Sequence, residues 1–210
     1  GRQENSTISP RRNTPSESTL VQVIGRMEKH TEHGGWTLMV ETVRVAVLYG
    51  FGINCDYETK AVFEMAGAEA DRIHVNELVN GSKTLADYHI MAVPGGFSFG
   101  DHLGSGRLLG NRLRFGIRDM VQEFVKSGKL VIGICNGFQV LVKMGLLPGD
   151  EDVSLTQTAS LTLNNTGHSE DRWVHLEFDQ DRPCVWTTGL ERIRVPARTG
   201  TSQLVNTLAH

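Results

Sequence analysis

From residue 43 onward, short apolar runs alternate with stretches in which apolar residues recur at helical spacing. The short runs are rich in β-branched residues, which predicts buried strands. The stretches between them predict amphipathic helices, each of which ends close to a glycine. The predicted strands are 43–48, 70–75, 87–93 and 129–134, and the predicted helices are 56–68, 115–129 and 136–145. This alternation predicts an α/β fold with a doubly wound, mostly parallel sheet.

The pattern changes on either side of this region. After residue 150 the chain reads as short strands joined by turns, which predicts a small antiparallel extension. Residues 1–41 are polar and rich in serine, threonine, proline and arginine, so we expect a disordered N-terminal tail. Residues 42–210 then make up the folded domain.

Composition narrows the function classes. Hydrophobic residues make up 39% of the chain and charged residues 21%, and the formal net charge is −3. This balance gives no reason to expect nucleic acid or a membrane as a partner. The three cysteines, Cys55, Cys135 and Cys184, are widely spaced and odd in number, which argues against a disulfide framework or a zinc site. We therefore expect free thiols and a cytoplasmic protein.

One cysteine has an unusual setting, because "VIGICNGFQV" at 131–140 places it between two glycines where a predicted strand meets a predicted helix. A Gly-x-Cys-x-Gly at such a junction is the thiol form of a nucleophile elbow. The bend holds the sulfur clear of the backbone, so Gly133 and Gly137 must carry no Cβ, and the helix start places partial positive charge near Cys135. The amide of Asn136 would point toward an oxyanion forming beside the sulfur. The alternative is a buried structural cysteine with glycine neighbours.

A second loop supplies the complementary half of such a site. "PGGFSFGD" at 94–101 follows the predicted strand at 87–93 directly. Because the carboxyl ends of parallel strands share one edge of a sheet, the amides of Gly96 and Phe97 can face the same oxyanion. The alternative for this loop is an ordinary β-turn. Cys55 follows the first strand at the same edge, where we expect a structural role, with Asp56 as the N-cap of the next helix.

Four stretches carry a specific combination of motifs: "VLYGFGINCDYETKAVFEMAGAEA" at 47–70, "PGGFSFGD", "GICNGFQVLVKMGLLPG" at 133–149 and "NNTGHSEDRWV" at 164–174. Together they resemble the glutaminase subunit of phosphoribosylformylglycinamidine synthase, a class I, triad-type glutamine amidotransferase with a flavodoxin-like fold. The likeness covers about residues 43–196, and the asparagine after the cysteine distinguishes it from most other class I amidotransferases.

This resemblance implies a reaction and a set of site residues. Cys135 attacks the side-chain amide of L-glutamine, a glutamyl thioester forms and ammonia is released, with Gly96 and Asn136 as oxyanion donors. Gly137 and Gln139 fall where the family lines the glutamine pocket. The ammonia passes to a separate synthetase subunit that converts formylglycinamide ribonucleotide to the amidine, and a small bridging subunit can join the complex. ATP and magnesium belong to the synthetase, so no cofactor is expected in this chain.

The carboxyl-terminal part departs from the family pattern. The family supplies the base and its orienting acid as a His-Pro-Glu near its end, and no such motif follows "RIRVP" here. Thr199 and Thr201 stand where the family has histidine and glutamate-like residues. We therefore expect a domain that is incomplete at this end and hydrolyses glutamine poorly. His175 and Glu177 have the right chemistry for a base and its acid, but they belong to a strand whose side chains we do not expect to reach the elbow.

Two alternatives from other classes stay open. The first is a non-catalytic module that keeps the fold in order to bind a synthetase. The second is a thiol hydrolase of the same superfold, and Asn136 argues against it because such enzymes carry a histidine after the nucleophile or an acid near it.

Overall fold

A parallel sheet of four strands lies at the centre of the molecule. The computed structural model describes residues 25–29, 36–40, 42–96, 107–150, 152–179, 181, 184–201 and 203–206, the first two ranges through their backbone alone. The strand order is β4-β3-β5-β6 and all neighbours are parallel. The strands are β3 (Arg44–Tyr49), β4 (Glu69–His74), β5 (Ile90–Val93) and β6 (Leu130–Gly133). All four predicted strands are therefore confirmed.

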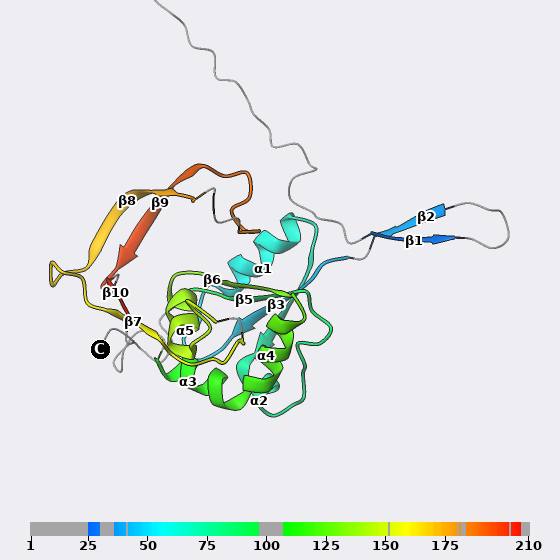
Figure 1. Ribbon diagram of the computed structural model, residues 1–210, viewed down its shortest axis with the longest axis horizontal. Coiled ribbons are helices and arrows are strands. Elements are labelled where there is room, and N and C mark those ends of the chain that lie inside the picture. The colour runs from blue at the N-terminus through cyan, green and yellow to red at the C-terminus, as the bar shows by residue number, and fades with distance from the viewer. Residues whose placement is uncertain are drawn as a thin grey trace, which may run out of the picture.

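Helices cover both faces of this sheet. Figure 1 shows α1 on one side and the other helices on the opposite side. The helices are α1 (Asp56–Met65), α2 (Val75–Val79), α3 (Arg107–Gly116), α4 (Arg118–Lys126) and α5 (Asn136–Met144). The doubly wound α/β fold that the sequence predicts is confirmed, as are the three predicted helices, with α4 shorter at both ends than expected.

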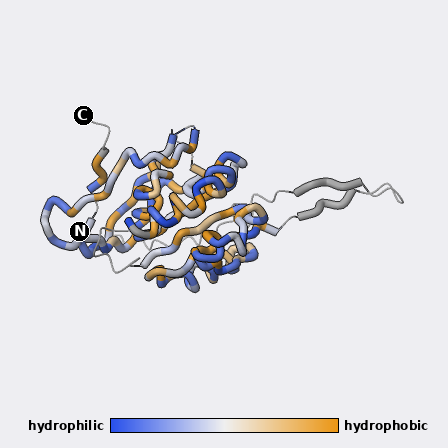
Figure 2. The backbone as a smooth tube through the Cα atoms, turned by 90° about the horizontal axis from the view of Figure 1, so that it is seen from below, coloured by the Kyte–Doolittle hydropathy of each residue, from blue (hydrophilic) through white to orange (hydrophobic). Residues whose placement is uncertain are grey.

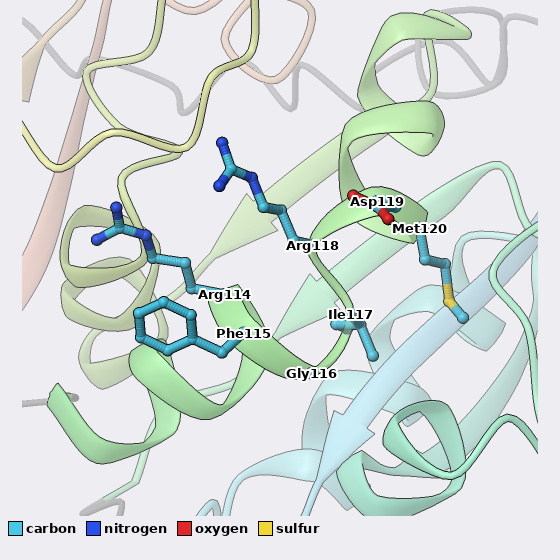
Figure 3. A pocket seen from close by; sticks show the side chains of 7 residues that line it. All are labelled: Arg114, Phe115, Gly116, Ile117, Arg118, Asp119 and Met120. Atoms are coloured by element: carbon cyan, nitrogen blue, oxygen red, sulfur yellow. The ribbon is translucent and has the colours of Figure 1, made fainter.

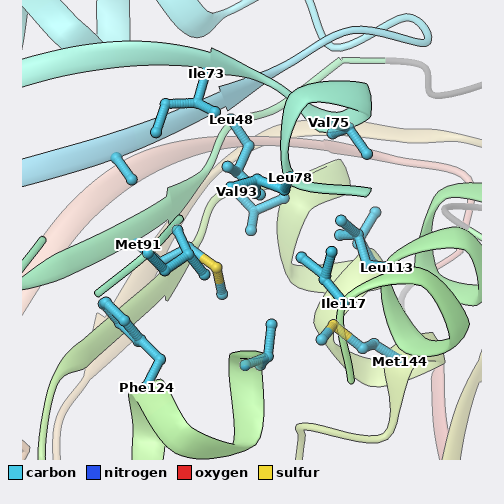
Figure 4. Close-up of a cluster of buried hydrophobic side chains, with 14 of the residues drawn as sticks. Leu48, Ile73, Val75, Leu78, Met91, Val93, Leu113, Ile117, Phe124 and Met144 are labelled. Atoms are coloured by element: carbon cyan, nitrogen blue, oxygen red, sulfur yellow. The ribbon is translucent and has the colours of Figure 1, made fainter. Parts of the chain in front are cut away.

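Alternating residues of β3 divide the core between the two faces. Ala46 and Leu48 belong to a large apolar cluster with residues of α2 to α5, whereas Val45 and Val47 face a smaller cluster that includes Phe63 of α1. Figure 4 shows the larger cluster between the sheet and the helices. Each fully buried side chain of this size contributes about 1.5–3 kcal/mol of transfer free energy, so the larger face dominates the stability of the sheet. Figure 2 accordingly shows hydrophobic segments inside this body and hydrophilic segments around it.

Two elements of the central body were not predicted from the sequence. The strand expected at 70–75 ends at His74, because the His74 side chain accepts a hydrogen bond from the Asn76 amide while Glu77 accepts one from the His74 amide, which begins α2. In α3, Gly110 lowers the intrinsic helix propensity. It allows α3 to pack closely against α5, because a Cβ on Gly110 would lie 3.1 Å from the carbonyl oxygen of Val140.

Beyond residue 150 the strands pair two by two. In one antiparallel ribbon β8 (Glu170–Glu177) pairs with β9 (Arg192–Thr199), and in another β7 (Ala159–Thr162) pairs with β10 (Gln203–Asn206). The predicted antiparallel extension is confirmed, although β10 itself was not foreseen. Figure 1 shows the β8–β9 ribbon standing beside the central body.

The outer edge of β6 is covered in part by the segment that leads into β9. The indole Nε1 of Trp186 donates a hydrogen bond to the carbonyl oxygen of Val131 at 3.1 Å. Trp186 also packs against the smaller apolar cluster. This contact joins the carboxyl-terminal part of the chain to the sheet.

A further hairpin lies within the segment predicted to be a tail. Strand β1 (Gly25–Lys29) pairs antiparallel with β2 (Trp36–Val40). Figure 1 shows this hairpin on the side of the body opposite the β8–β9 ribbon. The division of the chain at residues 41 and 42 stays a prediction.

Candidate active site

The candidate nucleophile Cys135 stands on a sharp bend between β6 and α5. Its φ is +54° and its ψ is −113°, a conformation that costs a residue with a side chain on the order of 1–3 kcal/mol. The residue is exposed, which contradicts the alternative of a buried structural cysteine. It is also the N-cap of α5, so its sulfur lies at the positive end of that helix. This is the geometry of a nucleophile elbow, and it supports the predicted catalytic role of Cys135.

Two glycines make the bend possible. A Cβ on Gly137 would lie 1.8 Å from the carbonyl oxygen of Val93, and a Cβ on Gly133 would lie 2.7 Å from Cδ1 of Leu141 and 2.8 Å from the carbonyl oxygen of Gly137. Atoms that are not bonded to each other cannot approach so closely, so any larger residue would force β5, β6 and α5 apart. The positions on either side of the cysteine therefore have no room for a Cβ, as the sequence predicts.

The loop after β5 lies directly beside the elbow. A Cβ on Gly95 would lie 3.4 Å from Cβ of Cys135. The carbonyl oxygen of Gly95 accepts hydrogen bonds from the amides of Asn54 and Cys55 at 3.2 and 3.3 Å. The loops that follow β3 and β5 and the turn that follows β6 thus meet at one point of the sheet edge.

The two predicted oxyanion donors flank this point. Gly96 is pressed against the loop after β3, since a Cβ there would lie 2.3 Å from the carbonyl oxygen of Gly52. Asn136 is the first residue of α5 and is buried. Their role as donors stays a prediction, and Phe97, the other donor considered, lies outside the described residues.

The side chain of Gln139 is held from both ends. Its Oε1 accepts a hydrogen bond from Nδ2 of Asn136 at 2.7 Å, and its Nε2 donates one to Oγ1 of Thr201 at 2.9 Å. Thr201 is fixed in turn by Thr199, whose hydroxyl donates to the Thr201 carbonyl and accepts from the Thr201 amide. Gln139 and Gly137, predicted to line the glutamine pocket, thus lie together on the first turn of α5.

Sequence reasoning did not foresee that Thr201 reaches this turn. Thr201 and its partner Gln139 are 62 positions apart, and no periodicity or motif links them. The departure of Thr199 and Thr201 from the family pattern was the one available signal. That departure pointed to the segment around residues 199–201 but did not indicate that it contacts Gln139.

Cys55 lies at the same edge as the elbow, at the N-cap position of α1. The expected capping role of Asp56 is wrong, because its buried carboxylate instead pairs with Arg72. Partial burial of the sulfur, followed by the charges of Glu58, Cys135 and Asp56, raises the pKa of the Cys55 thiol above its ordinary value. The second thiol of the site is therefore mainly protonated at neutral pH.

Two of the described histidines have structural partners. Nδ1 of His74 accepts a hydrogen bond from the Asn76 amide at 3.1 Å, and Nδ1 of His89 accepts one from the Arg44 amide at 3.0 Å. Each ring therefore stabilises the backbone of the central body, and its Nδ1 already accepts a hydrogen bond.

His175 and Glu177, the pair that we did not expect to reach the elbow, lie on the β8–β9 ribbon. His175 is paired in register with Arg194, and the carboxylate of Glu177 lies 3.9 Å from Nε of Arg192. Within the part of the chain that the structure describes, no hydrogen bond or ion pair joins Cys135 to a histidine or a carboxylate. His102 lies outside the described residues.

A shallow hollow of about 320 Å³ opens elsewhere, at the kink between α3 and α4. Figure 3 shows Arg114 and Arg118 extending from this kink, with the ring of Phe115 below them. Arg118 donates to the carbonyl oxygen of Ser154 at 2.7 Å, which anchors the loop after α5. None of the seven lining residues belongs to the elbow or to the loops beside it, so this hollow is separate from the candidate active site.

The comparisons with known proteins agree with this geometry. The profile of the CobB/CobQ-like glutamine amidotransferase domain matches residues 42–208. The chain belongs to this family. The amidotransferase domain therefore includes the elbow, the loops beside it and both carboxyl-terminal ribbons.

Relatives of this amidotransferase domain point to one group of the family. The phosphoribosylformylglycinamidine synthase subunit PurQ of Dehalococcoides mccartyi is 44% identical over 163 residues, which is 78% of this chain and 63% of that relative. The subunit of the same name from Methanococcus maripaludis is 42% identical over 163 residues, 77% of this chain and 60% of the relative. The amidotransferase domain thus spans about three-fifths of the length of these curated relatives.

A solved structure shares the same fold. A chain in the structure of PurLQS from Thermotoga maritima is 30% identical, with a TM-score of 0.61 over 79% of this chain and 70% of that one. Among the described residues, no helix of the amidotransferase domain is long and apolar enough to cross a membrane, and no cluster of three histidine, cysteine or acidic side chains is arranged to hold a metal ion.

Proposed function

We propose that this chain is the glutaminase part of a phosphoribosylformylglycinamidine synthase and releases ammonia from L-glutamine for purine biosynthesis. The observation that carries the proposal is the exposed thiol of Cys135, held in a strained bend at the start of α5 and against the glycine loop after β5. The PurQ relatives support the choice of reaction.

The geometry supports thioester chemistry at Cys135. Its sulfur attacks the carboxamide carbon of glutamine, and the amides of Gly96 and Asn136 stabilise the oxyanion that forms on the carboxamide oxygen. The carbon–nitrogen bond then breaks, and the nitrogen leaves as ammonia after taking up a proton. Water hydrolyses the thioester to glutamate and restores the thiol.

Gln139 orients the substrate in this proposal. Its carboxamide is immobilised between Asn136 and Thr201, so it presents one fixed donor and one fixed acceptor on the first turn of α5. A pre-oriented carboxamide can recognise the polar groups of glutamine without losing side-chain entropy on binding.

We expect hydrolysis by this chain to be slow. A thiol nucleophile needs a base held in place by a third group, and no described residue is bonded to Cys135 in that role. Members of a triad act as a unit, so a rate about a thousandfold or more below that of a complete triad is expected.

Partners and location extend the proposal. Ammonia would pass to a synthetase subunit that carries ATP and magnesium, and a small bridging subunit can complete the assembly. Glutamine hydrolysis through Cys135 needs no cofactor of its own. The three free, exposed cysteines fit a reducing compartment, and we place the reaction in the cytoplasm.

The proposal is tested by measuring ammonia release from glutamine with and without a purified synthetase subunit, using Cys135→Ala as the control. We expect slow release that depends on Cys135, and labelling of Cys135 by an electrophilic glutamine analogue. Release that is unchanged by Cys135→Ala, or absence of labelling, would overturn the assignment. Fast Cys135-dependent release would show that an effective base is present and would refute the expected impairment alone.

Among the described residues no base is bonded to Cys135, and this favours one second candidate, a module that binds the synthetase without catalysis. Complex formation separates the two functions, because a binding module forms the complex equally well after Cys135→Ala and shows no labelling by the glutamine analogue. A loss of complex formation in that variant would count against the binding module.

A further inference from the structure

Two thiols flank a single glycine at the active edge of the sheet. A methyl group placed on Gly95 would lie 3.4 Å from Cβ of Cys135 and 3.9 Å from Sγ of Cys55. The Cys55 sulfur and the base of the Cys135 side chain therefore both lie within van der Waals contact distance of one point beside Gly95. The two residues are 80 positions apart in the chain, so this proximity is produced by the fold.

The backbone holds the two cysteines in this relation. The Cys55 amide donates to the carbonyl oxygen of Gly95 at 3.3 Å, and Gly95 lies against the elbow that carries Cys135. Each cysteine is the N-cap of its own helix, α1 for Cys55 and α5 for Cys135. A disulfide needs its two Cβ atoms about 3.5–4.5 Å apart. Rotation of the two side chains turns the sulfurs toward each other, and we expect a shift of the loop that carries Cys55 to set the distance between the Cβ atoms.

Both thiols are accessible and neither is in a disulfide. The Cys55 sulfur makes a 3.4 Å contact with Oδ1 of its neighbour Asn54, a weak bond that does not prevent its reaction. Cys184, the third free cysteine, lies in the segment before Trp186 and provides an internal comparison.

We propose that Cys55 is a resolving thiol for Cys135, and that peroxide converts the pair into a reversible intramolecular disulfide. This modification does not depend on the proposed function; only its effect on glutamine hydrolysis does.

The oxidation proceeds in two steps. The Cys135 thiolate attacks one oxygen of hydrogen peroxide, a sulfur–oxygen bond forms, the oxygen–oxygen bond breaks, and the departing hydroxide takes up a proton to become water. The Cys55 thiol then attacks the Cys135 sulfur of this sulfenic acid, the sulfur–sulfur bond forms, and the sulfur–oxygen bond breaks. The hydroxide that leaves is protonated by the proton that Cys55 gives up. Two thiols and one peroxide thus yield one disulfide and two waters.

The disulfide has two consequences. It removes the nucleophile from the site, so glutamine hydrolysis stops until a thiol reductant restores it. It also protects Cys135 from further oxidation to the sulfinic acid, which thiols do not reverse. The elbow would therefore survive exposure to peroxide in a recoverable form.

The experiment treats the reduced full chain with hydrogen peroxide, blocks remaining thiols with an alkylating reagent and maps the peptides by mass spectrometry with and without dithiothreitol. We expect a Cys55–Cys135 disulfide within one chain, while Cys184 remains open to alkylation. Cys184→Ser should behave like the unmodified chain. In Cys55→Ser and Cys55→Ala, Cys135 should proceed to irreversible sulfinic acid, and circular dichroism should show that both variants keep the fold.

Alkylation of Cys55 in the peroxide-treated chain, or a disulfide that joins Cys184 or two chains, would overturn the proposal. Recovery of Cys135 by dithiothreitol in the folded Cys55 variants would also overturn it. Ammonia release, measured in parallel, reports on the function separately, since the disulfide forms whether or not the chain hydrolyses glutamine.

Discussion

The edge of the central sheet and the carboxyl-terminal ribbons are held together in different ways. At the sheet edge, backbone approaches backbone so closely that Gly133 and Gly137 cannot be replaced without displacing whole strands. In the β8–β9 ribbon, every described residue is at least partly exposed, and Trp173 is 60% exposed. Steric constraint therefore fixes the nucleophile, whereas the connection between the two ribbons contributes to the site through the Thr201 hydroxyl, which accepts a hydrogen bond from Gln139.

The largest effect is expected from a change that breaks the sheet edge. Gly137→Ala places a Cβ 1.8 Å from the Val93 carbonyl oxygen, so we expect the free energy of unfolding to fall by about 4 kcal/mol or more, measured by urea denaturation. The matched control is Gly167→Ala beside the β8–β9 ribbon, where no atom lies within 4 Å of the new Cβ. Its left-handed φ alone should cost about 1–2 kcal/mol. Equal losses in the two variants would contradict the comparison.

Relief of the strain at the elbow should give the next largest effect. Cys135→Gly removes the Cβ from a backbone with φ +54°, whereas Cys135→Ala keeps it. We expect the glycine variant to be about 1–3 kcal/mol more stable than the alanine variant by thermal and urea unfolding, although neither can form a thioester. An alanine variant as stable as the glycine variant would show that the bend is unstrained.

The hydrogen bond between the two regions should have a smaller effect that is specific to substrate. Thr201→Val removes the hydroxyl that accepts from Gln139, and a bond of this kind is worth about 1 kcal/mol, so labelling of Cys135 by an electrophilic glutamine analogue should slow about fivefold. Thr201→Ser should retain the rate of the unmodified chain. Alkylation by iodoacetamide, which does not resemble glutamine, should be unchanged in both variants. A parallel loss in iodoacetamide alkylation would mean that Thr201 supports the elbow as a whole.

The smallest effect concerns the charge around Cys55. Burial and the carboxylate of Glu58 raise the pKa of this thiol, so its reactive thiolate is scarce at neutral pH and increases as the pH rises. Glu58→Gln removes one negative charge, lowers the pKa and should speed alkylation of Cys55 by a neutral reagent about twofold at pH 7. Glu64→Gln, on the same helix but paired with Lys60, is the control and should change little. A slower reaction in Glu58→Gln would have the wrong sign for this explanation.

The central body could be predicted from the sequence because its signals are local. β-branched runs mark β3, β5 and β6, and the two glycines around Cys135 mark a bend that only they permit. Where strands and helices pack closely, steric requirements restrict which residue types can occupy a position, so the sequence itself indicates them.

The rest depends on contacts between distant segments. The partner of Gln139 is a threonine in the connection between β9 and β10, and a threonine is compatible with many environments, so nothing in its neighbours reveals the bond. Gly110 lowers the helix propensity of the α3 sequence, and its contribution, close packing against α5, involves a helix that is distant in sequence. The capping carboxylate of Asp56 was wrongly assigned for the same reason, since Arg72 of β4 competes for it.

The indole of Trp186 has a consequence for solubility. Strand β6 ends the sheet, and an unpaired margin of this kind can recruit a strand from another molecule. By occupying the Val131 carbonyl, the indole withdraws one of the acceptors that an incoming strand would need. A single aromatic side chain thereby discourages unwanted self-association at this edge of the sheet.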